Sequence, residues 1–400
     1  MKLYKKIKSC GIKKTIQDIY EYQIDKYLLK LLSFLLKNKP LQNIIVIESH
    51  NDFDSNGGAF YNYLISSGLN DKYKIVWLLK HPKFAPRDLP HNVTWVSEYT
   101  PSLMKNYYKL VAKYITSDQD CERKANKDQI SIFMTHGAVG LKDCSGLLTL
   151  PNDLNFCLTA SEWWRPLDAK QFGMNADNDK LKICGYPVHD VFYTQESGDL
   201  IKIVGENTFK KAILWMPTFR KNKIRRDSVL EQKLGIPIIN TIDEYKKLNE
   251  YLLEYNILLI VKIHPKQDIS DLKIYNCSNI KVLTGESVKQ KGIDNYRLMK
   301  DVDALISDYS SAAYDFLHCD KPIAYDLSDL ESYTRGIIVD DPHEMMAGHE
   351  IKDYDDLLMF IKDINEGRDV FRDERKELFD RVFKYHDGNS CKRVAELLKL

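Results

Sequence analysis

Short runs of β-branched and aromatic residues alternate with stretches of helical periodicity from about residue 43 onward, and this alternation limits the folds open to the chain. Apolar runs of this kind, bounded by polar turn residues, are typical of strands buried on both faces of a sheet. Strands that alternate with helices pair in parallel, because each return to the sheet requires a crossover connection. The pattern therefore predicts an α/β fold built on parallel sheets.

The predicted strands fall into two groups, which a polar linker at Tyr193–Gly205 separates. The first group covers residues 43–48, 74–79, 93–96, 114–116, 129–134, 155–158 and 180–184, and the second covers residues 211–215, 257–263, 280–283, 303–307 and 323–325. Predicted helices lie at residues 59–67, 103–111, 243–255, 296–302 and 312–318, and residues 344–400 are expected to be largely helical. We therefore expect two Rossmann-like domains around a central cleft, at 41–195 and 206–375, with a C-terminal helix at 376–400 able to cross back.

Polar side chains follow three strands of the second predicted sheet, each at the point where the strand ends. They are Thr218 and Arg220, then His264 and Lys266, and finally Asp308, Ser310 and Ser311. The carboxyl ends of strands in an open parallel sheet share one edge, and ligands bind there. In the first half, His136 and Gly137 have the same placement after the strand at 129–134. We therefore expect these residues to form a site.

The stretch Asp308–Ser311 precedes a predicted helix and has the character of an anion pocket. Free backbone N–H groups and the helix dipole favour negative charge at a helix N-terminus, and Ser310 and Ser311 add hydroxyl donors. Asp308 repels phosphate, so it is expected either to cap the helix or to accept a hydrogen bond from a ligand hydroxyl. Simple helix capping explains this stretch equally well when it is considered alone.

Composition restricts the class of protein. The chain has 400 residues, of which 44% are hydrophobic and 29% charged, and its formal net charge is +1. This suits a globular protein of two domains. The sequence lacks an apolar run long enough to span a bilayer and lacks a secretory cleavage site. Its eight cysteines are scattered without a Cys-x-x-Cys pair, which favours reduced thiols in a cytoplasmic protein and argues against structural zinc.

Residues 1–40 form a basic segment, with ten lysines against three acidic residues, a net charge of +7. Within it, Tyr27–Lys37 is a strongly apolar helix candidate. One interpretation is a basic amphipathic helix that lies on an anionic membrane surface. The other is a helix that packs on its own domain and leaves its lysines in solvent, and the sequence favours neither.

Three further signals receive structural interpretations. Asp301 and Asp303 form a D-x-D pattern, but they lie where a helix meets a buried strand, so a metal site is not expected. The polar loop from His50 to Asp54, with Gly57 and Gly58 after it, is interpreted as a turn. The basic loop 221–226 is at least as compatible with a solvated loop as with a site for an anionic polymer.

Six short motifs, taken in order, resemble those of a known family. They are Glu48-Ser49 with the following Ala59–Leu64, Thr135-His136-Gly137, Gly185-Tyr186-Pro187, Met216-Pro217-Thr218-Phe219-Arg220, Lys262-Ile263-His264-Pro265 and Ile306-Ser307-Asp308-Tyr309-Ser310-Ser311. This ordered set resembles the bacterial CDP-glycerol glycerophosphotransferases of teichoic acid and capsule synthesis, over roughly residues 44–340. The resemblance implies a GT-B fold, with an N-terminal acceptor-side domain and a C-terminal domain that binds CDP-glycerol.

The resemblance also implies a reaction. An acceptor hydroxyl attacks the glycerol-bearing phosphorus of CDP-glycerol, CMP leaves, and a phosphodiester-linked polymer grows. His136 corresponds to the family's general base, a role that suits a neutral imidazole. The groups implied to hold the pyrophosphate are Arg220, His264, Ser310, Ser311 and, less strongly, Lys266, with Gly137 and Thr218 beside the substrate and Asp308 orienting a donor hydroxyl or its neighbours. His136 and His264 are the catalytic candidates, and neither a metal, a cofactor nor a nucleic-acid partner is required.

The motifs also depart from the family. The family usually shows Trp-His-Gly-Thr-Pro, whereas Thr135 precedes the histidine here, and Val188 replaces the usual arginine after Gly-Tyr-Pro. A CDP-ribitol donor, a nucleotide-sugar donor of a GT-B glycosyltransferase, and a catalytically silent binding subunit therefore stay open. The resemblance places the chain in the cytoplasm, on the inner face of the cell membrane, where its acceptor is a polymer or a lipid-linked glycan.

Overall fold

A computed structural model of the chain describes residues 7, 11–137, 139–218, 220, 228, 232–265, 267, 270 and 272–400. Within these ranges the chain forms two compact units. The first unit contains the described residues up to 137, together with 145–190 and 384–400. The second contains residues 139–144 and the described residues from 191 to 383. The chain therefore enters the second unit briefly, directly after the His136 loop, before it completes the first.

The first unit is built on a parallel sheet of seven strands, in the order β3-β2-β1-β4-β5-β6-β7. The strands are β1 (Gln42–Glu48), β2 (Lys74–Leu79), β3 (Val93–Ser97), β4 (Ala112–Ser117), β5 (Ile130–Phe133), β6 (Phe156–Thr159) and β7 (Leu181–Ile183). The central strands β1, β2 and β4 are almost fully buried, because helices cover both of their faces. Their continuous apolar sequences are therefore explained by their place in the sheet.

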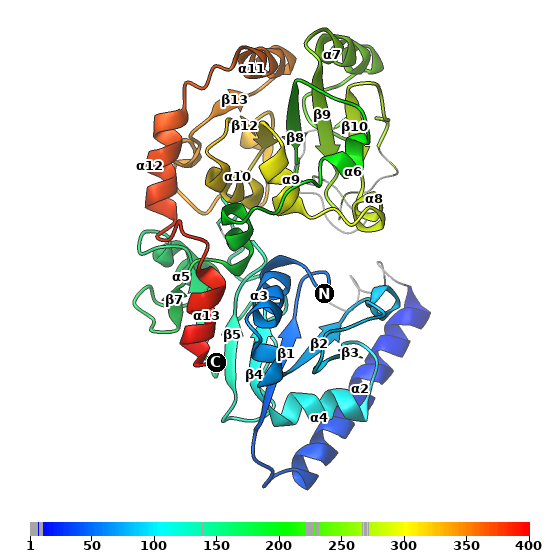
Figure 1. Cartoon of the computed structure of the whole chain (residues 1–400), viewed down its shortest axis with the longest axis vertical. Coiled ribbons are helices and arrows are strands. Elements are labelled where there is room, and N and C mark those ends of the chain that lie inside the picture. The colour runs from blue at the N-terminus through cyan, green and yellow to red at the C-terminus, as the bar shows by residue number, and fades with distance from the viewer. Residues whose placement is uncertain are drawn as a thin grey trace. The chain divides into compact units, whose positions relative to one another are not determined.

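Among the described residues, the α-helices that accompany this sheet are α2 (Ile12–Leu35), α3 (Ser55–Ser66), α4 (Leu103–Val111), α5 (Arg165–Phe172) and α13 (Ser390–Leu398). Short 3₁₀ turns occur at η1 (Leu69–Asp71), η2 (Pro82–Phe84) and η3 (Pro187–Tyr193). Figure 1 shows the long helix α2 beside α4. The Asp25 carboxylate of α2 accepts from Lys105 Nζ and Asn106 Nδ2 of α4, both at 2.7 Å. Polar pairing as well as apolar packing therefore attaches α2 to the first unit.

The start of the C-terminal helix α13 packs against the Gly-Tyr-Pro motif. Gly185 has a φ of +74°, and a Cβ atom there would lie 2.4 Å from Ser390 Oγ, so only glycine fits. Asp190 then accepts hydrogen bonds from the backbone N–H groups of Ser390 and Cys391, each at 2.8 Å, which satisfies the start of α13. This part of the family resemblance therefore has a structural role.

The second unit contains a parallel sheet of six strands, in the order β10-β9-β8-β11-β12-β13. The strands are β8 (Lys211–Trp215), β9 (Ile257–Lys262), β10 (Ile280–Leu283), β11 (Ala304–Ser307), β12 (Ile323–Asp326) and β13 (His349–Ile351). The α-helices are α6 (Ile201–Val204), α7 (Ile242–Glu254), α8 (Gly285–Gln290), α9 (Asn295–Asp301), α10 (Ser311–Phe316), α11 (Tyr354–Glu366) and α12 (Arg372–Val382). In the described part of this unit, 3₁₀ turns occur at η5 (Leu317–Cys319), η6 (Leu330–Ser332) and η7 (Pro342–Met345).

Helices α7 and α11 supply apolar side chains to the main core of the second unit. Leu248 of α7 and Phe360 of α11 belong to the same buried cluster as Trp215 of β8. Helix α7 begins with a capping box, in which the Thr241 hydroxyl and the Glu244 carboxylate accept each other's backbone N–H groups. A cap and an amphipathic face therefore explain why this stretch is helical.

The prediction of two parallel α/β units is confirmed, and the predicted strands match the observed ones to within about two residues at their ends. Residues 344–400 are largely helical, as predicted, through α11, α12 and α13, but one strand in this stretch was not predicted from the sequence. It is the edge strand β13, which pairs in parallel with β12. Strand β13 has three residues, and His349 and Glu350 are polar, so it lacks the apolar run that marks a buried strand.

Candidate active site

Strands β9, β8, β11 and β12 are consecutive neighbours in the second sheet, and polar side chains follow their carboxyl ends. The closest contacts join the loop after β8 to the loop after β11. Thr218 Oγ1 donates to Asp308 Oδ1 at 2.5 Å, and the Thr218 backbone N–H donates to Asp308 Oδ2 at 2.8 Å. The structure therefore brings together two of the residues that the sequence placed at this edge.

Asp308 is fully buried and organises the loops around it. Its Oδ1 atom also accepts from the Ser310 backbone N–H at 3.1 Å, and its Oδ2 atom accepts from Arg220 Nη1 at 2.8 Å. Burial opposes ionisation, but Arg220, Lys142 and the hydrogen bonds from Thr218 hold the pKa of Asp308 below its ordinary value. Asp308 is therefore a permanent carboxylate that orients its neighbours, one of the two roles expected from the sequence.

The Arg220 guanidinium forms ion pairs with two buried carboxylates, those of Asp308 and Asp329. Nε donates to Asp329 Oδ2 at 2.6 Å, Nη2 donates to Asp329 Oδ1 at 3.0 Å, and Nη1 is shared between Asp308 and the Thr218 carbonyl. Its side chain is only 3% exposed. The expectation that Arg220 contacts the pyrophosphate directly does not suit this geometry, because two carboxylates already outweigh its single charge. We assign Arg220 to positioning the loops.

Asp326 is a further buried carboxyl group at the same edge, and the sequence did not single it out. Its Oδ1 atom accepts from the Ser328 backbone and hydroxyl, at 3.1 and 2.7 Å. Its Oδ2 atom is buried and has no hydrogen-bond partner among the described residues. Burial raises the pKa of Asp326 to about 7, although the nearby Arg220 charge opposes the shift. This carboxyl group therefore titrates close to neutral pH.

Ser310 and Ser311 stand at the start of α10 and are half-buried. Ser310 is the N-cap of this helix, so the capping interpretation applies to it, although its hydrogen bond to the Ala312 N–H is long at 3.5 Å. His264 follows β9 and is also half-buried. Lys266, and the basic loop 221–226 considered above, lie outside the described residues. Ser310, Ser311 and His264 are thus the predicted polar groups at this edge that stay accessible.

His136 belongs to the first unit, where it follows β5 and has an exposed side chain, with Gly137 next to it. Thr135, the preceding residue, has a φ of +59°, which is rare for a β-branched residue and costs on the order of 1–3 kcal/mol. The buried Asn56 side chain donates to the carbonyl groups of Met134 and Thr135, at 3.1 and 2.8 Å. The backbone immediately before His136 is therefore held in a strained conformation.

The His50 imidazole stacks on His136. Their ring centroids are 4.9 Å apart, and the two planes are within 9° of parallel. His50 follows β1, and its backbone N–H donates to Oδ1 of the buried Asp118 side chain at 2.7 Å. The sequence alone predicts an ordinary turn for the loop that begins at His50. Its position after a strand of the same sheet was the available signal, and the structure makes it a neighbour of the candidate base.

Gly57 and Gly58 were assigned to the same turn, and this prediction was wrong because both lie in the first turns of α3. A Cβ atom on Gly57 would lie 2.9 Å from Ser49 Cβ, and one on Gly58 would lie 2.5 Å from the Phe53 carbonyl oxygen. These glycines therefore permit close packing of α3 on the loop after β1 rather than close approach of a ligand.

Three carboxylates, Glu48, Glu98 and Asp120, lie close enough at the carboxyl edge of the first sheet to hold a metal ion. Lys80 already supplies a cation there, with Nζ 2.5 Å from Glu48 Oε1 and 3.1 Å from Asp120 Oδ2. Burial raises the pKa of Glu98 to about 8, which further reduces the negative charge available at neutral pH. Lys80 and the protonation of Glu98 therefore offset most of the negative charge of this cluster.

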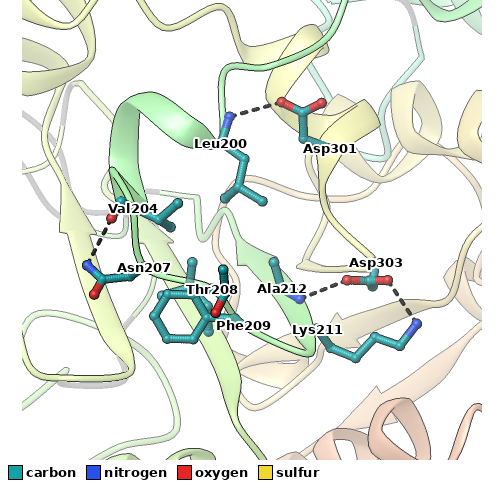
Figure 2. A pocket seen from close by; sticks show the side chains of 10 residues that line it. Leu200, Val204, Asn207, Thr208, Phe209, Lys211, Ala212, Asp301 and Asp303 are labelled. Atoms are coloured by element: carbon teal, nitrogen blue, oxygen red, sulfur yellow. Dashed lines mark hydrogen bonds and ion pairs between the residues drawn. The ribbon is translucent and has the colours of Figure 1, made fainter.

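A cavity of about 320 Å³ in the second unit lies at the opposite, amino-terminal edge of its sheet (Figure 2). Asp303 pairs with Lys211 at 2.9 Å and accepts from the Ala212 N–H at 2.8 Å, whereas Asp301 accepts from the backbone N–H groups of Gly198 and Leu200. Both carboxylates of the D-x-D pattern are therefore satisfied by the protein, which supports their structural interpretation.

A model of the CDP-glycerol:poly(glycerophosphate) glycerophosphotransferase family matches residues 30–400. The chain belongs to this family. The predicted family and its reaction class, the transfer of glycerol phosphate by an enzyme, are therefore confirmed.

Relatives with curated names act in teichoic acid synthesis. The teichoic acid glycerol-phosphate primase of Bacillus subtilis is 28% identical over 287 residues, which are 68% of this chain and 67% of the primase. The teichoic acid glycerol-phosphate transferase of Staphylococcus aureus is 23% identical over 97% of this chain and 99% of its own length. The ribitol-phosphate polymerase TarK of S. aureus is 29% identical over 59% of this chain, but only 44% of TarK is covered. Glycerol and ribitol enzymes thus both occur among the relatives.

Solved structures support the fold. A variant of the wall teichoic acid polymerase TagF soaked with CDPG has a TM-score of 0.71 at 18% identity, over 100% of this chain and 98% of that one. A UDP-N-acetylglucosamine 2-epimerase has a TM-score of 0.51 at 12% identity, over 90% of this chain and 96% of that one. The predicted GT-B architecture of two parallel-sheet units is therefore confirmed.

Proposed function

We propose that this protein transfers glycerol phosphate from CDP-glycerol to a hydroxyl group of a teichoic-acid-like or capsular polymer and releases CMP. The observation that carries the proposal is the convergence of Thr218, Asp308 and Ser310 at the carboxyl edge of the second sheet, in a chain whose family performs this transfer. Phosphate ligands favour such edges, because backbone N–H groups point outward there.

In the proposed donor site, accessible groups contact the diphosphate and buried groups hold them in place. Ser310 and Ser311 offer hydroxyl and backbone donors, and His264 offers an imidazole. Thr218 and Arg220 fix Asp308, and Asp308 in turn fixes the Ser310 backbone. Neutralising the phosphates makes the glycerol-bearing phosphorus easier to attack and stabilises CMP as it leaves.

His136 is the proposed general base of the first unit. Its exposed ring, after the strained Thr135, is held from one side by His50, so its orientation is restricted before the substrate arrives. As the acceptor oxygen bonds to phosphorus, His136 takes the hydroxyl proton and the bond between that phosphorus and the CMP oxygen breaks. A neutral imidazole performs this role near pH 7.

We also propose that α2 holds the protein on the anionic inner face of the cell membrane, where a polymer or lipid-linked acceptor would be found. One face of α2 packs on the first unit through Leu29 and Leu32, and Leu36, which caps the helix, packs on the same cluster. The other face exposes apolar residues at helical spacing; they are Ile12, Ile16, Ile19, Tyr20, Tyr27, Leu31, Phe34 and Leu35, each at least 44% exposed. The exposed Lys26 and Lys30 flank this face.

The helix thus has apolar side chains on two opposite faces, which combines the two interpretations that the sequence left open. Among the described residues, none of the helices is both long enough and apolar enough to cross a bilayer. Association through one face of α2 is therefore the mode of membrane binding that we propose.

The experiment that tests the reaction is nucleotide release in the presence of a polymer or lipid-linked acceptor extract. CDP-glycerol, CDP-ribitol and a panel of UDP-sugars are compared as donors. We expect CMP from CDP-glycerol and much less from CDP-ribitol. CMP mainly from CDP-ribitol would reassign the donor, since the relatives include ribitol enzymes. Release of UDP would overturn the proposal in favour of a glycosyltransferase, and binding without release would indicate a silent subunit.

A further inference from the structure

The short segment 139–144 is fixed against the donor edge of the second unit by backbone hydrogen bonds. The Leu141 N–H donates to the Tyr309 carbonyl at 3.2 Å, and the Leu141 carbonyl accepts from the Ile338 N–H at 2.8 Å. Lys142 also forms an isolated antiparallel bridge with Ile337. The segment therefore lies between the loop after β11 and the chain near residue 337.

Gly140 brings this segment close to the start of α10. A Cβ atom on Gly140 would lie 3.3 Å from the Ser311 backbone nitrogen and 3.7 Å from Ser311 Cβ. That separation is short for a side-chain contact, so glycine permits the approach. Lys142, two residues later, is thereby placed at the same edge as Ser311.

The Lys142 side chain is half-buried, and it forms no hydrogen bond or ion pair with any residue in the part of the chain that the structure describes. Burial lowers the pKa of its ammonium group to about 8, while the Asp308 carboxylate favours the charged form and Arg220 and Arg335 oppose it. A cation that is partly removed from water and lacks a direct partner gains free energy when an anion binds beside it.

Arg220 is poorly suited to supply this charge, because Asp308, Asp329 and the Thr218 carbonyl take four of its five N–H donors. Within this group of described residues, the carboxylates of Asp308 and Asp329 outnumber the Arg220 guanidinium that joins them, so the group has a net negative charge before a diphosphate binds. Ser310 and Ser311 supply hydrogen bonds but no charge. An unpaired lysine close to Asp308 therefore corrects an electrostatic imbalance that would otherwise repel the ligand.

We propose that Lys142 is a donor-binding residue, whose ammonium group contacts the diphosphate of the CDP-activated substrate. The inference rests on the proposed function, because it names a residue of the donor site. It replaces Arg220 by Lys142 as the cation that meets the phosphates, and it gives segment 139–144 a role in the site.

The test is the Kd of CDP-glycerol, measured by calorimetry without acceptor, for the wild type and for Lys142→Ala and Lys142→Arg. A charge-assisted hydrogen bond is worth about 1.5–3 kcal/mol, so Lys142→Ala should weaken binding by about 10- to 100-fold. Lys142→Arg keeps the charge and should bind within about 5-fold of the wild type. Lys210→Ala is the matched control, because it removes one positive charge next to the start of β8, where Nζ contacts Asn365. It should leave the Kd unchanged.

A pH series separates a direct contact from a structural role. The diphosphate of CDP-glycerol carries no group that titrates near neutral pH, so changes in affinity report on the protein. Wild-type affinity should fall as the pH rises from 7 to 9.5 and Lys142 loses its proton, whereas the affinity of Lys142→Arg should stay nearly flat. Asp308, Arg220, Arg335 and Cys144 are charged or titratable groups that act on Lys142, Asp143 is its neighbour in the chain, and both proteins share them.

Unchanged Kd in Lys142→Ala, together with wild-type binding of CDP-glycerol, would overturn the inference and leave the proposed function intact. Parallel pH profiles of affinity for the wild type and Lys142→Arg would also overturn the inference. This comparison does not need Lys142→Ala, so it applies even if that variant does not fold. Absence of CDP-glycerol binding by the wild type would instead overturn the proposed function, and this inference with it.

Discussion

Arg220 and Asp329 form a two-point ion pair in the interior of the second unit, with Nε 2.6 Å from Oδ2 and Nη2 3.0 Å from Oδ1. Both side chains are 3% exposed. The same guanidinium also contacts Asp308, so it joins the loop after β8 to those after β11 and β12. Tyr309 and Tyr333 place their rings 5.4 and 5.5 Å from its Cζ atom. The pair is therefore a structural junction at the edge that we assign to the donor.

Arg220→Met should reduce the free energy of unfolding of the second unit by about 3–5 kcal/mol, because it leaves two buried carboxylates without their partner. Arg220→Lys should have a smaller effect, since an ammonium group keeps the charge but cannot make the planar two-point contact. Hydrogen exchange in peptides that cover β11 and β12 measures this loss of stability in the second unit. If Arg220→Lys were as stable as the wild type but bound CDP-glycerol weakly, the result would contradict a purely positioning role. It would instead support the direct contact between Arg220 and phosphate that was expected from the sequence.

Asp326 should make the stability of the second unit depend on pH. Its pKa is about 7 in the folded state against 3.8 ordinarily, so between about pH 4 and 7 the unfolded state binds fewer protons. The stability contribution is therefore present at low pH and is lost as the pH rises through 7, at up to about 1.4 kcal/mol per pH unit. Asp326→Asn should remove this dependence. The two proteins are compared at each pH by exchange of peptides covering β12, so that other titrating groups and intrinsic exchange rates cancel.

A constant difference between wild type and Asp326→Asn from pH 5 to 8 would contradict a titrating Asp326. Ser328→Ala is the companion variant, because it removes the hydroxyl that donates to Oδ1 but keeps the carboxyl group. It should lower stability by about 1 kcal/mol and retain the pH dependence.

Most of the fold could be predicted from the sequence, because strands such as β1 and β9 are continuous apolar runs. Runs of this kind are typical of buried strands and are not expected in exposed segments. Prediction from the sequence failed at β13, where His349 and Glu350 face partly outward at the edge of the sheet. The same reasoning located His136, Thr218, His264 and Asp308, because the end of a recognisable strand fixes its place at a sheet edge.

The contacts of these residues could not be derived in the same way, because their partners lie far along the chain. Asp329 is 109 residues from Arg220, and no local pattern connects them. Lys142 follows a strand of the first unit but belongs to the second, so its neighbours depend on where the chain crosses between the units. Burial and pairing, which decide whether a charge is available to a ligand, are properties of the folded chain.

His50→Ala should lower the rate of CMP release by about 10-fold, because the His136 ring loses the surface on which it stacks and becomes less well oriented. His136→Ala should lower it by at least about 100-fold, as expected for loss of a general base. Both variants should keep the donor affinity of the wild type. His50→Phe is the matched control, since it preserves an aromatic surface and should recover most of the rate. Equal losses in His50→Phe and His50→Ala would indicate that the His50 imidazole itself takes part.

Ile16→Glu and Phe34→Glu, each made as a single replacement, should release the protein from vesicles that contain anionic lipids. These residues are 61% and 77% exposed and lie on the face of α2 opposite to Leu29 and Leu32, which pack on the core of the first unit. Carboxylates on that face oppose both apolar insertion and the attraction between flanking lysines and lipid headgroups. Co-sedimentation with vesicles, with and without anionic lipid, measures the effect.

Tyr22→Glu provides the control, because Tyr22 is 66% exposed on the same helix but stands off the apolar stripe. It changes the charge of α2 equally and should reduce binding only slightly, by the roughly 1 kcal/mol that one charge contributes near an anionic surface. If all three glutamates acted alike, simple charge would explain the binding and the apolar face would have no part in it. If none acted, α2 would serve only to pack on α4, where Asp25 already joins it to Lys105 and Asn106.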